Sequence, residues 1–253
     1  MIKPCLVALQ FLTRFPVHIA GNISERSIGQ SILYYPLVGL LIGAILVGIM
    51  MLLNTLLPTP LLAALLITLW VLITGALHLD GLADSADAWL GGHGDKERTL
   101  SIMKDPRCGS AAVVILVLIL LTKFSAMQAI LDSSLWPSLL VIPVLSRTSL
   151  LLLFLTTPYV RKNGLGQLLA DHLPRRMSWI ITGLVSILIL IFIDNSLWLL
   201  GITAIVFLAL RGLMMKRLQG FTGDTAGALV EILEVALLTV AIIISDWNDS
   251  FLI

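Results

Sequence analysis

Charge and cysteine are both scarce in this sequence. Asp, Glu, Lys and Arg make up 12% of its 253 residues, about half of the roughly 25% that is typical of a soluble domain. This scarcity excludes an ordinary soluble enzyme and a disordered chain. A net charge of +1 also gives no basic surface for a nucleic acid, so no nucleic-acid partner is expected. The two cysteines, Cys5 and Cys108, cannot form a disulfide framework and match no metal-binding spacing.

Apolar residues are abundant instead, and they gather in long runs. They make up 58% of the chain, and the mean hydropathy is +1.02. Because a membrane-spanning helix needs about 20 mostly apolar residues, the runs predict an all-α, polytopic integral membrane helical bundle, a single membrane domain over residues 1–253. Seven transmembrane spans are expected, at residues 32–57, 61–79, 110–131, 135–157, 177–193, 197–215 and 226–245.

The N-terminal segment, residues 1–31, is expected to lie at the membrane interface. Gln10, Arg14 and Pro16 interrupt its apolar stretch before any small-residue cleavage site, so we do not expect a cleavable signal. Residues 4–15 are predicted to form a short amphipathic helix in the interface.

The basic residues indicate how the spans are oriented. Fourteen of the sixteen Lys and Arg residues lie in residues 1–31, 80–109, 158–176 and 211–217, whereas the short connections 58–60, 132–134 and 194–196 and the C-terminal tail carry none. Cytoplasmic segments collect Lys and Arg. The pattern therefore predicts a cytoplasmic N-terminus, a place in the inner (cytoplasmic) cell membrane, and a site that faces the cytoplasm.

Three aspartates stand at helical spacing in the segment 80–109, which we interpret as a cytoplasmic acidic catalytic loop. If one helix runs past Gly81, Asp80, Asp84 and Asp87 share a face within about 10 Å along its axis. Such carboxylates repel one another unless a divalent cation lies among them. Mg²⁺, with Mn²⁺ as the alternative, takes oxygen ligands together with water and substrate phosphates. The competing interpretation is that the three acids form a solvated helix end. The neighbouring His78 is expected to lie at the membrane interface with its hydrogen bonds satisfied, and not to be a ligand.

A basic loop follows the acidic helix. Lys104 and Arg107 flank an acid just before Gly109, where the next helix is expected to begin. Cationic side chains and free backbone N–H groups together favour a phosphate. A basic loop beside a membrane is also the ordinary signal of topology, and this interpretation stays open.

Four charges lie inside the expected spans: Lys123, Arg147, Glu231 and Glu234. A central Lys or Arg costs roughly 3 kcal/mol to insert, so such residues face the interior of the bundle. Two interpretations remain, an interhelical ion pair between Arg147 and Glu234, or a polar cavity that descends from the inner face and accounts for all four.

Two glycine-containing segments complete the polar side of the chain. Glycines in residues 161–166 would allow the backbone to approach a ligand closely. Residues 220–227 begin the last span, with Thr222 or Asp224 placed as an N-cap.

Taken together, these motifs resemble those of the cobalamin 5'-phosphate synthase family, the adenosylcobinamide-GDP ribazoletransferases. The resemblance covers nearly the whole chain, and the acidic run is its most specific part. Pro106, where a small hydroxyl residue is expected, and Ala111–Ala112, where glycine is expected, depart from the pattern. The motifs are residues 11–17 (FLTRFPV), 78–87 (HLDGLADSAD), 102–107 (IMKDPR), Ser146–Arg147, 163–166 (NGLG), and 222–225 (TGDT) followed by Glu231 and Glu234.

The resemblance implies an Mg²⁺-dependent membrane transferase of the last steps of cobalamin biosynthesis. It would join adenosylcobinamide-GDP to α-ribazole, or to its 5'-phosphate, and release GMP. Besides these substrates its partners would be the lipid bilayer and, as an open option, a second copy of itself or other cobalamin-assembly enzymes.

The resemblance also implies roles for particular residues. Metal ligands would be Asp80, Asp84 and Asp87, and catalytic residues would be Asp84, Asp87, Lys104, Arg107 and Arg147. The residues implied in substrate binding are Arg14, Lys123, Asn163, Gly164, Gly166, Thr222, Asp224, Thr225, Glu231 and Glu234.

Two other functions compete with this interpretation. A CDP-alcohol phosphotransferase of lipid synthesis also carries acids at helical spacing, although its Ala-Arg-Gly arrangement and two later aspartates are absent here. A secondary transporter could use the four intramembrane charges as an ion relay, but transporters usually have repeated halves around a midplane site.

Overall fold

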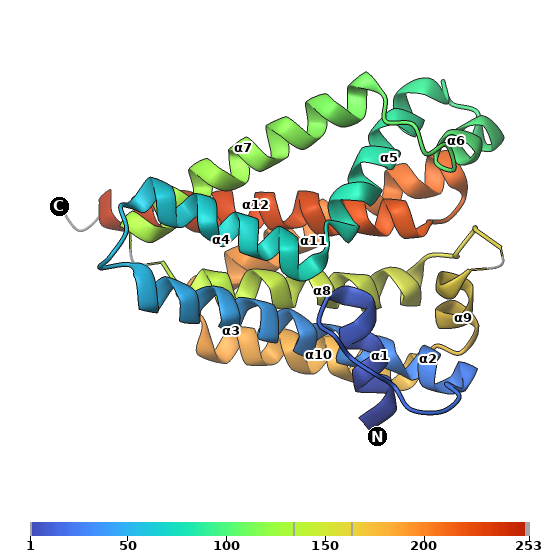
Figure 1. Cartoon of the computed structure of the whole chain (residues 1–253), viewed down its shortest axis with the longest axis horizontal. Helices are drawn as coiled ribbons and strands as arrows, with labels where there is room; N and C mark the ends of the chain where they lie inside the picture. Colours follow the sequence, from blue (N-terminus) through green and yellow to red (C-terminus); the bar gives the residue numbers. More distant parts are fainter. Residues whose placement is uncertain (1, 134, 163, 251–253) are drawn as a thin grey trace.

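The structure, a computed structural model, describes residues 2–133, 135–162 and 164–250 (Figure 1). Its helices are α1 (Ile2–Leu12), α2 (Glu25–Ser31), the short 3₁₀ helix η1 (Ile32–Tyr34), α3 (Tyr35–Leu53), α4 (Thr59–Thr74), α5 (Leu77–Gly91), α6 (Lys96–Ile102), α7 (Ser110–Asp132), α8 (Pro137–Thr156), α9 (Leu165–Asp171), α10 (Arg175–Phe192), α11 (Ser196–Leu218) and α12 (Gly223–Ser250).

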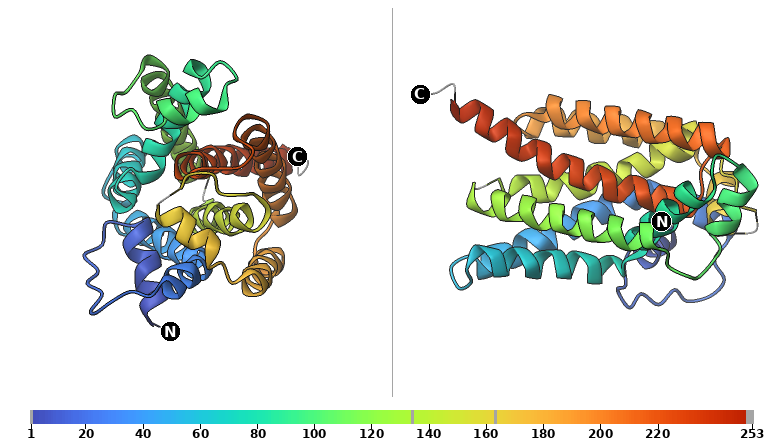
Figure 2. Two further views of the ribbon diagram at one scale, coloured as in Figure 1. Left: turned by 90° about the vertical axis from the view of Figure 1, so that its right-hand side faces the viewer. Right: turned by 90° about the horizontal axis from the view of Figure 1, so that it is seen from above.

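The long helices run side by side in one bundle, with α8 and α12 the most enclosed (Figures 1 and 2). Among the described residues, six helices are long and apolar enough to cross a membrane, and a seventh crossing is counted if the bent pair α4 and α5 forms one span. The predicted all-α, multi-span membrane bundle is therefore confirmed.

The second expected span, residues 61–79, ends earlier than its hydropathy indicates. Helix α4 stops at Thr74 because Gly75 adopts a left-handed conformation, with φ +61°. The N–H groups of Gly75 and Ala76 then donate to the carbonyl oxygens of Leu72 and Val71, which is a Schellman ending. Helix α5 leaves at 86° to α4, so the acidic segment is a separate helix and not the continuation of the span.

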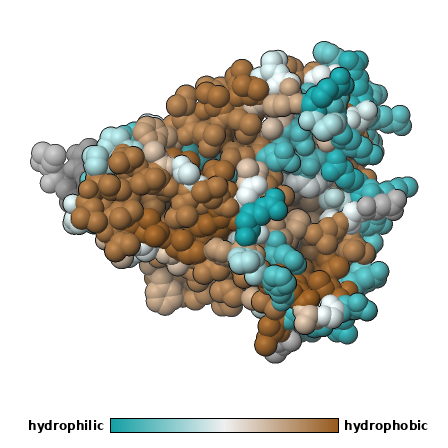
Figure 3. All heavy atoms as spheres, in the orientation of Figure 1, coloured by the Kyte–Doolittle hydropathy of each residue, from teal (hydrophilic) through white to brown (hydrophobic). Residues whose placement is uncertain are grey.

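The polar residues gather at one end of the bundle (Figure 3). The N-terminal segment, α6, α9 and the α11–α12 connection all lie at this end (Figures 1 and 2). At the opposite end, the hydroxyl of Thr59 donates to Asp132 at 2.9 Å and links two of the short connections. The basic segments thus share one end, as their alternation along the chain predicts.

Helix α1 covers Ile2–Leu12, where the sequence predicts a helix over residues 4–15. Its buried residues include Val7, Ala8 and Leu12, and Phe11 stacks on Tyr35 with ring centroids 6.3 Å apart. One side of the helix therefore packs on the bundle.

Helices α3 and α8 make the most extensive helix–helix contact, and small residues allow it. A Cβ atom on Gly43 would lie 2.6 Å from the carbonyl oxygen of Leu139. The two backbones thus touch, as in membrane helix pairs joined through small residues.

We expect Gly43→Ala to destabilise the bundle by about 1–3 kcal/mol, because the added methyl group forces α3 and α8 apart. Gly48→Ala is the matched control: it lies on the same helix with open space beside it, and should be neutral or up to about 1 kcal/mol more stable. Thermal unfolding of both variants in one detergent measures the difference, and equal transition temperatures would contradict the close contact.

Candidate active site

The acidic helix α5 runs through Gly81 without a break, as expected, and crosses the start of α12 at close range. A Cβ atom on Gly81 would lie 2.7 Å from the carbonyl oxygen of Asp224, and one on Gly227 would lie 3.1 Å from that of His78. Because both positions are glycine, the two backbones can meet. This crossing brings the first turns of α5 beside Asp224.

The three aspartates of α5 do not converge on one point, which corrects the expected three-carboxylate cluster. Asp87 accepts hydrogen bonds from the backbone N–H groups of Gly109 (2.6 Å) and Ala112 (3.0 Å). Both of its oxygens therefore cap the first turn of α7. In the part of the chain that the structure describes, no three His, Cys, Asp or Glu side chains are grouped so that they could hold a metal ion.

Asp84 lies in a crowded acidic environment beyond the bend that ends α4. Partial burial and the negative charges of Asp80, Asp224 and Asp87 together raise its pKa to about 6, against the opposing effect of Arg161. The charges of Asp80 and Asp87 of α5 and of Asp224 of α12 therefore all act on Asp84. We call the part of the surface that carries Asp80, Asp84 and Asp224 the acidic edge.

Arg161 is a site residue that the sequence analysis counted only as a topology signal. It forms an ion pair with Asp224 at 3.2 Å and donates to the carbonyl oxygen of Met103 at 3.3 Å. A β-bridge between Tyr159 and Phe221 holds the two chain segments together. The pairing of distant segments places Arg161, and no local motif could have indicated it.

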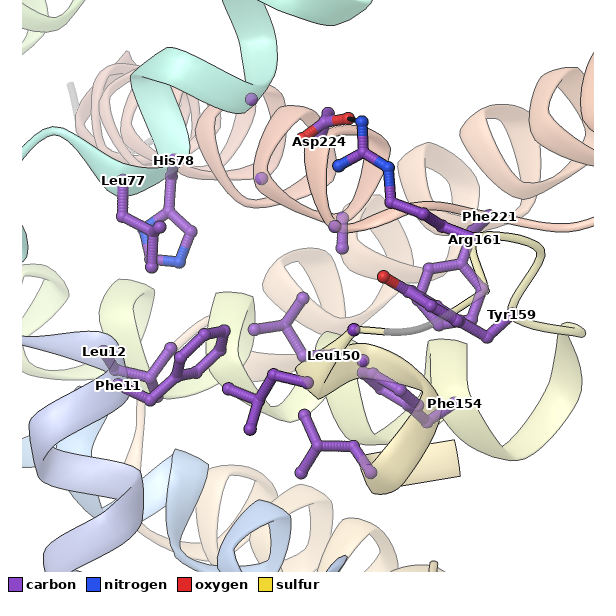
Figure 4. Close-up of a pocket in the computed structure, with 18 of the residues that line it drawn as sticks. Phe11, Leu12, Leu77, His78, Leu150, Phe154, Tyr159, Arg161, Phe221 and Asp224 are labelled. Atoms are coloured by element: carbon purple, nitrogen blue, oxygen red, sulfur yellow. Dashed lines mark ion pairs between the residues drawn. The ribbon is translucent and has the colours of Figure 1, made fainter. Parts of the chain in front are cut away.

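A cavity of about 280 Å³ opens between α1, α5, α8, α9 and the start of α12 (Figure 4). Asp80, Asp224 and Arg161 line it, together with Gly164 and Gly166, which were expected to contact substrate. The aromatic and leucine side chains that make up much of its wall come from helices far apart in the sequence. Asn163, also expected to bind substrate, lies outside the described residues.

Thr222 and Thr225 belong to the helix cap and do not line this cavity. The backbone N–H of Thr222 donates to the hydroxyl of Thr225 at 2.9 Å, and the N–H of Thr225 donates to the hydroxyl of Thr222 at 3.3 Å. This reciprocal pair confirms Thr222 as the N-cap of α12 and resembles a capping box. Of this motif, Gly223 and Asp224 line the cavity.

The basic loop after α6 lies beside the same edge. Met103 is buried, accepts from Arg161, and has its sulfur 3.7 Å from the hydroxyl of Thr222. Lys104 next to it is exposed. The exposed Arg107 forms a bidentate pair with Asp105, which holds the pKa of that carboxyl below its usual range.

Arg14 has a different place, over the bend between α4 and α5. Its backbone N–H donates to the carbonyl oxygen of Ile73 at 2.7 Å, and its side chain occupies the space that a Cβ on Gly75 would need. The N-terminal segment is thereby attached to the point where the acidic helix begins.

The four intramembrane charges form one buried cluster. The Nζ atom of Lys123 lies 2.7 Å from both Glu231 and Glu234, and Arg147 pairs with Glu234 on its other side. The hydroxyl of Ser146 also lies 3.1 Å from Glu234. The ion-pair interpretation is therefore correct, with Lys123 as an additional member.

The alternative of a polar cavity descending to these charges is not supported. None of the four side chains lines the cavity, and Arg147 and Glu234 are fully buried. Helices α7, α8 and α12 supply two cations and two anions that compensate one another, since unpaired charges are costly at this depth.

The donors at the acidic edge suit a hard divalent cation. Asp80 and Asp84 offer carboxylate oxygens, whereas Cys and His ligands would be needed for a typical zinc site. Mg²⁺ usually binds through one or two carboxylates together with water and substrate phosphates, so a third protein carboxylate is not required. Asp87 could join such a site only by giving up its cap on α7.

Comparison with known proteins shows which family this arrangement belongs to. The family model described as cobalamin-5-phosphate synthase matches residues 4–242. The chain is a member of this family. It is 55% identical over 236 residues to an adenosylcobinamide-GDP ribazoletransferase of Pseudomonas putida, covering 92% of this chain and 96% of that protein.

Two other relatives agree with this assignment. An adenosylcobinamide-GDP ribazoletransferase of Pseudomonas fluorescens is 53% identical over 238 residues, covering 93% of this chain and 97% of that protein. An adenosylcobinamide-GDP ribazoletransferase of Pseudomonas syringae is 53% identical over 249 residues, covering 95% of this chain and 99% of that protein. No solved structure matches the chain. These findings favour neither the lipid phosphotransferase nor the transporter.

We expect Lys123→Met to destabilise the protein by about 3–5 kcal/mol, because two buried glutamates would then share one cation. Adding Glu231→Gln to Lys123→Met should restore much of the lost stability, because the charges of the remaining Arg147 and Glu234 then compensate each other. Unfolding of the single and double variants in detergent measures this. If Lys123 instead binds substrate without stabilising the fold, Lys123→Met would have the stability of the wild type and would lose only its turnover.

Proposed function

We propose that this protein transfers the cobinamide phosphate of adenosylcobinamide-GDP to α-ribazole, or to its 5'-phosphate, with release of GMP. Membership of the family supports the reaction, and the acidic edge beside a cavity offers a place for it. The observation that carries the proposal is that Asp80, Asp224 and Arg161 line the same cavity, where Arg161 forms an ion pair with Asp224.

In this reaction a ribose hydroxyl attacks the phosphorus nearer to cobinamide, and the bond to the oxygen of GMP breaks. Negative charge then accumulates on the phosphoryl oxygens, and catalysis depends on positioning and electrostatic stabilisation. Asp84, at the centre of the acidic edge, is suited to orient the attacking hydroxyl. Arg161 and the nearby Lys104 are suited to hold phosphate oxygens.

The proposal includes Mg²⁺, with Asp80 and Asp84 as the residues that would hold it. A bound divalent cation would supply neutralisation of the diphosphate charge. Arg107 would contribute to diphosphate binding after release from Asp105. Arg147 is proposed to act indirectly, by holding the helices that present the acids.

The proposed location is the inner cell membrane, with the polar end in the cytoplasm. The basic residues that gather at this end support it, because cytoplasmic segments collect Lys and Arg. Nucleotide substrates would then reach the acidic edge from the compartment that contains them.

We expect Asp84→Asn to reduce Mg²⁺-supported GMP release by at least about a hundredfold, because the carboxylate is lost from the site of charge stabilisation. Glu97→Gln is the control, since Glu97 is an exposed acid on the neighbouring α6 and should keep its turnover. Purified protein in detergent, given both substrates and a series of Mg²⁺ concentrations, provides the measurement. Unchanged turnover in Asp84→Asn would refute its role.

A further inference from the structure

The cavity beside the acidic edge has an apolar part and a charged side. Leu12, Leu77 and Leu150 line the apolar part, which we call the inner part, whereas Arg161 and Asp224 lie at the charged side, which we call the mouth (Figure 4). Its volume of about 280 Å³ is at the small end of ligand sites, which are roughly 300–1,000 Å³. A corrin macrocycle with its amide side chains is several times larger than this space.

Three aromatic rings form one wall of the cavity. Phe221 meets Phe154 edge-to-face at 4.8 Å between ring centroids, and meets Tyr159 in the same way at 5.2 Å. Phe154 and Tyr159 are nearly parallel, at 10°. Interlocked rings of this kind give a rigid, apolar surface on which a planar aromatic ligand can pack.

His78 is the polar exception in the inner part. It comes from the first turn of α5, is 3% exposed, and its ring points into the cavity (Figure 4). Its Nδ1 atom has no hydrogen-bond partner among the described residues, which corrects the expectation of a satisfied histidine. A buried polar group without a partner is costly. A turn of the ring would bring this nitrogen to the cavity, where a bound ligand that pairs with it would remove the cost.

The two aromatic bases among the proposed substrates differ in what they need from such a cavity. The dimethylbenzimidazole of α-ribazole is flat and apolar, with one free ring nitrogen that accepts a hydrogen bond. Guanine carries several donors and acceptors, and most of them would be left unpaired against leucine and phenylalanine. A neutral imidazole donates one N–H, which matches the single acceptor of the benzimidazole.

We propose that this cavity binds the base of α-ribazole, with the imidazole of His78 donating to the free ring nitrogen of the base. The inference rests on the proposed function and identifies which substrate occupies the cavity. With the base inside, the ribose lies at the mouth beside Asp80, Asp224 and Arg161, where its hydroxyl meets the diphosphate. The corrinoid and its guanosine then remain outside, on the open side of the acidic edge.

The test combines a substitution at His78 with a change in the ligand. In the wild-type protein, an α-ribazole analogue with a C–H in place of the free ring nitrogen should bind about tenfold more weakly, as expected for one lost hydrogen bond. His78→Leu should weaken α-ribazole binding by a similar factor and make the two ligands equal. His78→Gln, which keeps an N–H donor, should recover part of the preference. Equilibrium dialysis with protein in detergent measures all of these without turnover.

Two further readouts separate recognition from a structural role. The KM for adenosylcobinamide-GDP should stay unchanged in His78→Leu, and its thermal stability should be equal to or above that of the wild type, because an unpaired polar group is removed. The exposed His93 provides the control variant, His93→Leu, which should leave the binding of both α-ribazole and its analogue unchanged.

The outcomes distinguish this inference from the proposed function. If wild-type protein releases no GMP from the two substrates, the proposed function fails. If GMP is released but α-ribazole and its analogue bind equally to the wild type, or His78→Leu raises the KM of both substrates alike, the assignment of the cavity is wrong while the reaction stands.

Discussion

The backbone contact between α5 and α12 is the constraint on which the rest of the site depends. Gly81 and Gly227 leave no side chain between the two helices, so Asp224 comes beside Asp80 and Asp84. The same crossing places His78 in the wall of the cavity that Arg161 also lines. A larger residue at either glycine would separate the acids from the cavity. Neither the acids without the cavity nor the cavity without the acids would serve a transfer between two substrates.

The bend at Gly75 makes this crossing available. Had α4 continued straight, as the hydropathy of residues 61–79 predicts, the acidic segment would extend along the axis of the span and away from α12. The left-handed residues Gly75 and Ala76 instead redirect the chain by 86°. Arg14 packs over this bend, so the N-terminal segment helps to fix the direction of α5.

Local patterns predicted the parts of the site that depend on neighbouring residues. The helical spacing of the aspartates, the N-cap at Thr222 and the polar side of the bundle are all legible in the sequence. The capping of α7 by Asp87 and the pairing of Arg161 with Asp224 are not, because each joins segments far apart in the chain. The sequence leaves open whether Arg147 pairs with Glu234 or faces a cavity, because that depends on how the helices rotate about their axes.

The difference between the two charged regions explains why only one of them suits the chemistry. In the buried cluster, Lys123 and Arg147 balance Glu231 and Glu234, so the cluster has no net charge to offer a ligand and instead holds α7, α8 and α12 together.

At the acidic edge, which carries Asp80, Asp84 and Asp224, the ion pair between described residues is that of Arg161 with Asp224, so the carboxylates outnumber the paired cation. This excess of negative charge would repel a diphosphate that arrived alone. A diphosphate accompanied by a divalent cation is attracted to the same carboxylates, since the cation reverses the sign of the local charge. The uncompensated edge, and not the buried cluster, is therefore where a metal-dependent phosphoryl transfer is physically favourable.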